Sequence, residues 1–255
     1  MAYWIRFTHA GKTHIGTLEG DIVEVHDGDL FGRPLATGVR LPLTAVKLLT
    51  PVTPGKLIGL WNNFHQRAQA EGLSQPPHPL YFIKADTSYL AEGEAIRRPA
   101  GYDGKIVFEG ELGIVIGKAC RNIGVAEAAG HIFGYTCVND VTARDWLKCD
   151  PSFVQWTRAK GCDSFGPFGP GIRTGIEPDG LSVRVLVNGE EKQNYPVADM
   201  FYRPREVVAR ISQDMSLSPG DIISCGTSLG AGPIQSGDTV QVVIDGVGIL
   251  TNRVE

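Results

Sequence analysis

The chain has 255 residues, of which 42% are hydrophobic and 20% are charged, and its formal net charge is −4. A chain of this size and composition can bury a full core, and its acidic balance excludes the broad basic surface of a nucleic-acid-binding protein. With 32 glycines and 16 prolines, the sequence favours short strands joined by turns over a helical bundle. Five cysteines without a Cys-x-x-Cys pair indicate neither a disulfide framework nor a zinc site.

The sequence shows no sign of membrane insertion or secretion. No apolar run approaches the length of a membrane span. The first residues, MAYWIRFTHAGKTH, lack the cationic segment and apolar run of a signal peptide. We therefore expect a cytoplasmic protein without a membrane partner.

The N-terminal part of the chain predicts a small β unit. Short alternations of apolar and polar residues recur over residues 3–25, and Gly and Asp turns separate them. A proline-rich hinge, PVTPG, follows at 51–55. We therefore divide the chain into an N-terminal β subdomain, 1–52, and a main domain, 53–255.

A short helix is expected near the beginning of the main domain. The apolar strand 56–61 leads into NNFHQRAQAEG, where Asn63 is a candidate helix cap and Gly72 a candidate helix end. The following SQPPHP blocks regular structure until the strand 80–84. Because it has few apolar anchors, segment 62–80 is predicted to act as a lid over a site.

The rest of the main domain predicts further strands and one longer helix. The strongest strand covers 105–117, and a second apolar strand covers 131–139. An amphipathic helix is expected over 204–215, with three apolar residues on one face: Val207, Val208 and Ile211. Later strands are expected at 181–189, 239–245 and 246–255. The sum is a β-rich α+β fold with few, peripheral helices.

Two glutamates share one face of the strand 105–117. Residues two apart point the same way in a strand, so Glu109 and Glu111 lie on one face with the apolar Val107 and Val115. Glu-x-Glu in a strand is commonly a solvated polar face, but this face is apolar on both sides of the pair, as in a strand buried on both faces. Two adjacent buried carboxylates repel unless a cation neutralises them. A hard cation such as Mg²⁺ meets this need.

Asp140 is the best candidate for a third carboxylate. It directly follows the buried strand 131–139, where a side chain is well placed to reach a site. Its alternative role is to cap a helix in the following TARDW segment, because aspartate is among the preferred caps. The residues alone leave both roles open.

The sequence around these carboxylates resembles the metal-binding core of the fumarylacetoacetate hydrolase family. FEGELGIVIGK and then GYTCVNDVTARDW match the family's Glu-x-Glu and Asn-Asp-x-x-x-Arg-Asp elements. Further matches run in family order over residues 55–253: GLWNNFH, PLYFIKADTS, RAKGCDSFGPFGP, SPGDIISCGTSLGAG and SGDTVQVVIDGVGILTN. The resemblance implies the family's mixed β-sheet roll or sandwich, a homodimer and a bound Mg²⁺, with Mn²⁺ or Ca²⁺ as alternative metals.

The same resemblance implies roles for individual residues. The implied metal ligands are the three carboxylates, Glu109, Glu111 and Asp140. Arg144 and Lys160 match residues that hold the substrate's carboxylate or oxo group, and Lys160 also counts among the catalytic residues. Thr227 matches a position that contacts the substrate, and His65 matches the family's histidine base. Taken alone, Arg144 could pair with Asp145, Thr227 could only shape a turn, and Lys160 could be a solvated loop residue.

The sequence departs from the family pattern at the water-activating group. The family's hydrolases commonly place a glutamate three residues after the histidine, where this chain has Ala68. Glu71 is the substitute carboxylate, although it lies six residues after His65 and therefore about 120° off its face on a regular helix. We expect Ala68→Glu to raise hydrolysis if that carboxylate alone is missing. Leu147 stands where relatives often have glutamine, and Ile58 where some have a metal-binding aspartate.

The implied activity is that of an enzyme acting on a small anionic 2-oxo acid. We rank first the cleavage of a carbon–carbon bond of a 2-oxo or 1,3-dioxo acid, by acylpyruvate hydrolysis or oxaloacetate-type decarboxylation. The alternative is isomerase or decarboxylase action on 2-hydroxyhepta-2,4-diene-1,7-dioate, a compound of aromatic catabolism. Two rivals belong to other classes: a non-catalytic member that binds a metal and an organic acid, and a Ca²⁺-stabilised structural protein.

Overall fold

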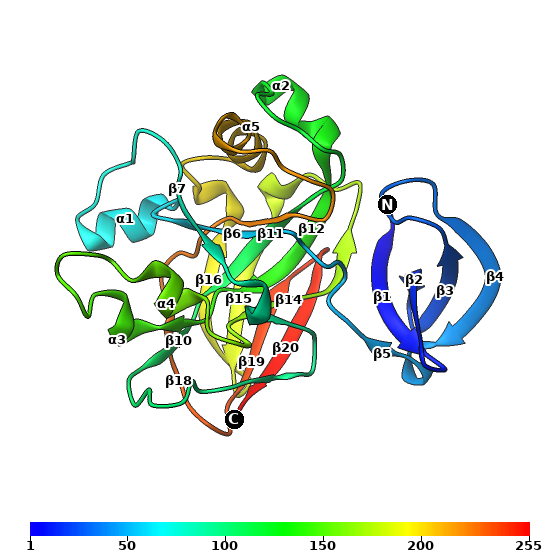
Figure 1. Ribbon diagram of the computed structural model, residues 1–255, viewed down its shortest axis with the longest axis horizontal. Coiled ribbons are helices and arrows are strands. Elements are labelled where there is room, and N and C mark those ends of the chain that lie inside the picture. The colour runs from blue at the N-terminus through cyan, green and yellow to red at the C-terminus, as the bar shows by residue number, and fades with distance from the viewer.

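Three β-sheets form most of the molecule, and short helices lie around them (Figure 1). The computed structural model describes the whole chain, Met1–Glu255. The first sheet has the strand order β4-β3-β2-β1-β14-β12-β11-β17-β6-β7. A five-stranded sheet has the order β16-β15-β19-β20-β9, and a three-stranded sheet the order β13-β10-β18. None of the helices has the length and hydrophobicity of a membrane-spanning segment.

The N-terminal strands form one end of the first sheet, at the right of Figure 1. Ala10 and Gly11 both have positive φ in the two-residue turn after β1, as hairpin turns require. Alternating side chains of these strands pack into a small cluster of their own, which includes Ile5, Phe7 and Val23. The bounds are β1 Tyr3–His9, β2 Lys12–Glu19, β3 Ile22–Asp27, β4 Leu35–Pro42, the 3₁₀ helix Leu43–Ala45 and β5 Lys47–Leu48.

The middle of the first sheet consists of strands buried on both faces. Every residue of β11, between β12 and β17, is buried, because the sheet is covered on both sides. The bounds are β6 Leu57–Trp61, β7 Leu80–Lys84, β8 Tyr89–Leu90, β11 Gly110–Ile116, β12 Ile132–Asn139, β14 Gly166–Arg173 and β17 Ile222–Ser224.

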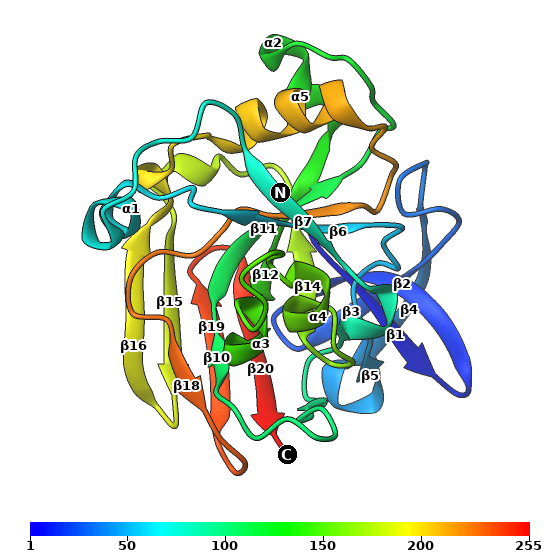
Figure 2. The same ribbon diagram turned by 60° about the vertical axis from the view of Figure 1, so that its left-hand side comes forward.

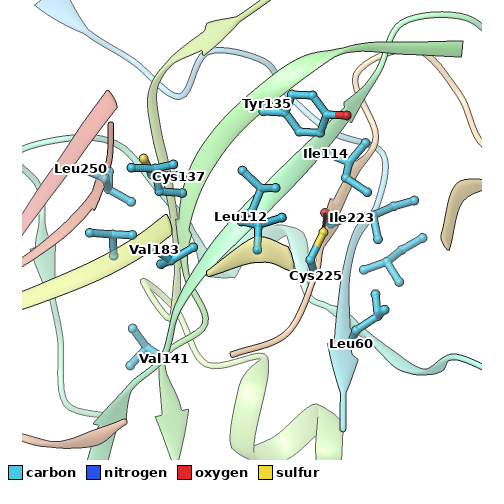
Figure 3. Close-up of a cluster of buried hydrophobic side chains, with 14 of the residues drawn as sticks. Leu60, Leu112, Ile114, Tyr135, Cys137, Val141, Val183, Ile223, Cys225 and Leu250 are labelled. Atoms are coloured by element: carbon cyan, nitrogen blue, oxygen red, sulfur yellow. Dashed lines mark hydrogen bonds between the residues drawn. The ribbon is translucent and has the colours of Figure 1, made fainter. Parts of the chain in front are cut away.

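The main core lies between the first sheet and the five-stranded sheet, which Figure 2 shows side by side. Leu112 of β11 and Cys137 of β12 belong to the same buried cluster as Val183 of β15 and Leu250 of β20 (Figure 3). The bounds in the two smaller sheets are β9 Ala95–Ile96, β10 Ile106–Phe108, β13 Thr142–Ala143, β15 Ser182–Val187, β16 Glu190–Pro196, β18 Gly232–Ile234, β19 Thr239–Ile244 and β20 Gly248–Val254.

Helices are few, and only α5 reaches three turns. It buries the predicted apolar face, including Val207, Val208 and Ile211, and thus confirms the amphipathic helix. The bounds are α1 His65–Glu71, α2 Val125–Ala128, α3 Arg144–Leu147, α4 Trp156–Lys160 and α5 Pro204–Asp214. The remaining 3₁₀ helices cover Asp86–Ser88, Ala129–His131, Pro178–Gly180 and Val197–Asp199. The predicted β-rich α+β fold with peripheral helices is confirmed.

Two local predictions were wrong. The strand expected over 105–117 is interrupted at Glu109, where the backbone N–H donates to the side chain of Asn139 at 3.0 Å instead of continuing a ladder. Asn63 does not cap α1, because its amide is buried and donates to the carbonyls of Tyr202 (3.3 Å) and Cys225 (2.9 Å). The helix does end at Gly72, which has φ +68°.

The predicted subdomain boundary at residue 52 stays a prediction. The N-terminal strands have their own apolar cluster, yet the first sheet continues across this boundary. Tyr3 and Trp4 of β1 pair with Arg173 and Ile172 of β14. The N-terminal unit is therefore joined to the main sheet by backbone hydrogen bonds as well as by its linker.

Candidate metal centre and adjoining cavity

Three buried carboxylates meet where β11 and β12 pair. Gly110 lies opposite Asn139 in this antiparallel pair, so Glu109 and Glu111 flank the position at which Asp140 leaves β12. The backbone N–H of Asp140 donates to the carbonyl of Glu109 at 2.8 Å. One carboxylate oxygen of each acid lies within 4.8 Å of the others, and all three side chains are buried. The structure thus brings together the trio that the sequence singles out.

Glu111 has one oxygen engaged and one free. Its Oε2 accepts hydrogen bonds from the Ser224 hydroxyl (2.5 Å) and the Gly226 N–H (2.8 Å), whereas its buried Oε1 has no partner. Burial, followed by the charges of Asp140 and Glu109, raises the pKa of Glu111 to about 8. A buried oxygen without a donor, in a cluster of like charges, is the environment that a cation stabilises. The donor set of three carboxylates therefore fits a hard divalent cation such as Mg²⁺, Mn²⁺ or Ca²⁺.

Two buried lysines contact the trio from one side. Lys160, the last residue of α4, donates to Glu109 Oε2 at 2.6 Å and also to Asp140 Oδ2. Lys84, at the end of β7, donates to Asp140 Oδ1 at 2.6 Å and to the Val141 carbonyl at 3.3 Å. Burial alone would raise the pKa of Asp140, but the two lysines outweigh it and lower that pKa. Asp140 is thus held ionised and does not cap a helix, because the residue before α3 is Ala143.

Lys84 is a site residue that sequence reasoning missed. Its side chain is only 1% exposed, which is unusual for a lysine and requires a paired charge. The signal was available, because a lysine that closes the apolar strand LYFIK cannot continue into a buried sheet without a partner. The two lysines thus pair with Glu109 and Asp140, and the third carboxylate, Glu111, has no cationic partner in the cluster.

The peptide between the two glutamates is held by three side chains. The Gly110 N–H donates to Gln193 Oε1 at 3.0 Å, and its carbonyl accepts from the hydroxyls of Thr227 (2.9 Å) and Tyr195. Gln193 Nε2 also donates to Thr227 Oγ1 at 2.9 Å. A Cβ at Gly110 would come within 2.2 Å of a Val185 methyl carbon, so only glycine fits here. The Thr227 hydroxyl already donates its single hydrogen within the protein.

Two adjoining cavities give access to the site. A small cavity, of about 20 Å³, lies against Glu109, Lys160 and Thr227. A larger one, of about 1460 Å³, is lined by residues of α1, α3 and α4, which gather on one side of the molecule (Figure 1). The two cavities share six residues: Trp61, Arg67, Phe82, Arg144, Leu147 and Trp156. Together they form a path from the surface to the carboxylates.

Helix α1 turns Arg67, and not His65, toward this path. His65 is exposed, its ring centre lies 4.1 Å from that of Phe201, and it lines neither cavity. Residues two apart on a helix lie about 200° apart around its axis, which explains why one of the pair faces away. Arg67 lines both cavities, and Glu71 lines the larger one and accepts from Arg67 Nε at 2.9 Å. Sequence reasoning missed Arg67, and the catalytic role of His65 stays a prediction.

Arg144 also lines both cavities, from the first position of α3. The alternative pairing with Asp145 does not form, because Asp145 instead accepts from the backbone N–H of Lys105 at 3.0 Å. Arg144 has no ion-pair partner in the protein. Its guanidinium therefore stays available to an anion in the cavity.

Comparison with known proteins relates this site to one family. A family model described as fumarylacetoacetate (FAA) hydrolase C-terminal matches residues 56–255, and one described as Rv2993c-like, N-terminal matches residues 4–51. The chain is 42% identical to protein Rv2993c of Mycobacterium tuberculosis, over 88% of this chain and 84% of that protein. It is 33% identical to the oxaloacetate tautomerase YisK of Bacillus subtilis, over 93% of this chain and 87% of that protein.

Solved structures agree with this relationship. The 2-hydroxyhepta-2,4-diene-1,7-dioate isomerase from Mycobacterium marinum has a TM-score of 0.91 at 38% identity, with 100% of this chain and 98% of that chain covered. The maleylpyruvate hydrolase from Sphingobium sp. SYK-6, in complex with manganese(II) ion and pyruvate, has a TM-score of 0.80 at 27% identity, with coverage of 100% and 98%. The protein described here therefore belongs to the fumarylacetoacetate hydrolase family.

Proposed function

We propose that this chain is a metal-dependent enzyme that interconverts the enol and keto forms of a small 2-oxo acid. The observation that carries the proposal is the unpartnered Oε1 of Glu111, buried among the carboxylates of Glu109 and Asp140. When bound there, a divalent cation such as Mg²⁺ supplies Lewis-acid stabilisation of the negative charge that grows on the substrate's oxo oxygen. The names of two relatives, a tautomerase and an isomerase, support the same reaction class.

The substrate's carboxylate is bound by arginines in this proposal. Lys160 donates its hydrogen bonds to Glu109 and Asp140. Its main role is therefore to neutralise carboxylates of the site, and not to bind the substrate. Arg144 and Arg67 both line the small cavity. Guanidinium groups bind carboxylates in a bidentate manner, and a net-acidic protein must supply such cations locally to recruit an anion.

Glu71 is the general base in this proposal. It is the carboxylate of α1 that lines the larger cavity, and its hydrogen bond with Arg67 fixes its position there. Its carboxylate accepts the proton that leaves carbon 3 of the keto acid and returns it in the reverse direction. Enolisation needs no activated water, which agrees with Ala68 in place of the hydrolase glutamate and with the outward position of His65.

Hydrolytic carbon–carbon cleavage of an acylpyruvate is the second candidate function. The solved maleylpyruvate hydrolase relative favours it. This reaction needs a group that activates water, and on the present geometry α1 has to move to bring His65 to the carboxylates. Decarboxylation of an oxaloacetate-type acid also proceeds through an enolate, and we group it with hydrolysis as carbon–carbon bond cleavage.

The test uses purified protein stripped of metal and then supplied with Mg²⁺ or Mn²⁺. We expect the metal to accelerate enol–keto exchange of oxaloacetate, followed by the ultraviolet absorbance of the enol. Glu71→Gln should lower kcat by about 100-fold, the order expected for a general base, while the exposed Glu190→Gln serves as the matched control. A rate independent of metal would contradict the proposal. Metal binding without turnover of oxaloacetate, acetylpyruvate or phenylpyruvate would instead indicate the non-catalytic alternative.

A further inference from the structure

We propose that the larger cavity selects a 2-oxo acid that carries an aromatic ring, and that Trp61, Phe82 and Trp156 form the wall on which this ring packs. The inference rests on the proposed function, because it places the oxo-acid end of the ligand at the carboxylate trio. The carboxylate trio and the two arginines contact only the oxo and carboxylate groups of the ligand. The aromatic wall specifies the chemical group attached to them.

The three aromatic side chains come from separate elements and form one continuous surface. The rings of Phe82, from β7, and Trp156, from α4, lie parallel with centres 5.1 Å apart and planes 9° apart. Trp61, from β6, meets Trp156 edge-on at 6.0 Å. Trp61 and Trp156 are only partly buried, although large aromatic side chains gain most from full burial. The wall therefore keeps apolar surface that a flat ligand could cover.

This wall begins at the metal centre itself. All three aromatic residues line the small cavity together with Glu109 and Lys160. The Lys160 ammonium lies 5.1 Å from the centre of the Phe82 ring, so the wall and the carboxylate cluster are in direct contact. A ring attached close to the oxo group therefore reaches the wall without a long spacer.

Most charged side chains that line the larger cavity are already engaged within the protein. Asp214 and Glu71 line it beyond the small cavity, and Asp214 accepts from the Tyr81 hydroxyl at 2.9 Å. Arg210 is neutralised by Glu206, to which it donates at 2.8 and 3.0 Å. Lys148, which lines the larger cavity but not the small one, is an exposed residue. Apart from Arg67 and Arg144, the partly buried aromatic wall is therefore the main surface left for the rest of the ligand.

The cavity has room for a ring on the ligand. Its volume of about 1460 Å³ exceeds the roughly 300–1,000 Å³ of common small-molecule pockets. A four-carbon acid held at the carboxylates would leave the aromatic wall in contact with water. A ring on the ligand removes that water from Trp61 and Trp156, and apolar burial of this kind favours binding.

The test compares two 2-oxo acids that cannot enolise, so that binding is measured without turnover. Phenylglyoxylate carries a ring, and trimethylpyruvate carries a branched aliphatic group. Calorimetric titration into the Mg²⁺-loaded protein should show phenylglyoxylate binding at least tenfold more tightly. Trp156→Leu and Trp61→Leu should each bring the ratio of the two affinities near one, whereas Trp156→Phe should keep most of it. Trp4→Leu, in β1 and outside both cavities, is the matched control and should keep the wild-type ratio.

Failure of this inference and failure of the proposed function give different results. Equal affinity for the two acids, or a preference that survives both leucine variants, would overturn the aromatic wall while leaving the proposed function standing. Oxalate, which has only the two oxygen groups of the anchor, provides the second measurement. If oxalate fails to bind the Mg²⁺-loaded protein, the oxo-acid site itself is refuted. The proposed role of the aromatic wall is then refuted as well, because it depends on that site.

Discussion

Gln193 and Gly110 are joined by a 3.0 Å hydrogen bond across 83 positions of sequence, although neither belongs to the candidate ligand set. The bond fixes the peptide that separates Glu109 from Glu111. The other end of the same amide donates to Thr227, and the Gln193 side chain is fully enclosed. One amide from β16 therefore sets the positions of two candidate ligands and of the residue expected to contact the substrate.

Replacing this amide should weaken metal binding from a distance. Gln193→Leu leaves the Gly110 N–H without its acceptor, and loss of such an outer contact typically costs 10–100-fold in metal affinity. We expect a loss of that order for Mg²⁺ by calorimetric titration. Asn194→Ala, at the next and exposed position of β16, is the control. If Gln193→Leu binds Mg²⁺ as tightly as the wild type does, the amide has no positioning role.

Lys84→Met should lower the free energy of unfolding of the metal-free protein, while its affinity for Mg²⁺ should not fall. The substitution leaves Asp140 buried with one fewer partner, and breaking a buried ion pair costs about 3–5 kcal/mol. The lost positive charge also makes the carboxylate cluster more attractive to a cation, so added Mg²⁺ should restore part of the stability. Urea unfolding with and without Mg²⁺ measures both effects. The exposed Lys12→Met is the control, and equal stability of the two variants would refute this account.

Glu111→Gln tests whether the charge of this side chain, and not its shape or hydrogen bonds, is needed for metal binding. Glutamine keeps an oxygen for the Ser224 hydroxyl and the Gly226 N–H but removes the charge that repels Glu109 and Asp140. We expect Mg²⁺ binding to weaken at least tenfold in calorimetric titrations, while the metal-free variant unfolds at the same or a higher temperature than the metal-free wild type. A metal-free variant that unfolds well below the wild type would show that Glu111 serves the fold rather than a cation.

Ala68→Glu should not restore a water-activating pair, contrary to the expectation from the sequence pattern. Ala68 is only 1% exposed, on the buried side of α1, and the His65 ring packs outward against Phe201. A glutamate here would bury a charge without a partner, so we expect a melting temperature at least several degrees lower. Gln69→Glu, at the next and exposed position, is the control. A stable Ala68→Glu protein with raised acylpyruvate hydrolysis would prove the sequence expectation right.

Much of the fold and of the candidate site could be predicted because the signals are local. The apolar face around Glu109 and Glu111 indicated buried carboxylates, and the apolar face of α5 indicated its packing. The strand LYFIK indicates that Lys84 is buried and paired, but the partners of Lys84 and Gln193 could not be identified in this way. Their partners, Asp140 and Gly110, lie 56 and 83 positions away, and no periodicity in the sequence records such a contact.

The rotation of α1 about its axis was a second feature that the sequence did not predict. A helix of two turns has few apolar residues to show which side it buries, so the pattern did not reveal that Arg67 faces the cavity and His65 the solvent. The break at Glu109 was hidden for a similar reason. It depends on the side chain of Asn139, 30 positions away, which accepts the hydrogen bond of the Glu109 N–H, and this is a tertiary contact.

The pairing of β1 with β14 has a consequence for how the chain folds during synthesis. The Ala2 carbonyl accepts a hydrogen bond from the Thr174 N–H, and the Ala2 N–H donates to the Thr174 hydroxyl, across 172 positions. At about 5–20 residues per second, ribosomes deliver this partner roughly 10–30 s after the first strand. The hairpins β1 to β4, with their own small core, can form in that interval, and β5 can already pair with Phe7 and Thr8 of β1. Only the beginning of β1, at Tyr3 and Trp4, stays without its β14 partner until residues 172–173 have been synthesised.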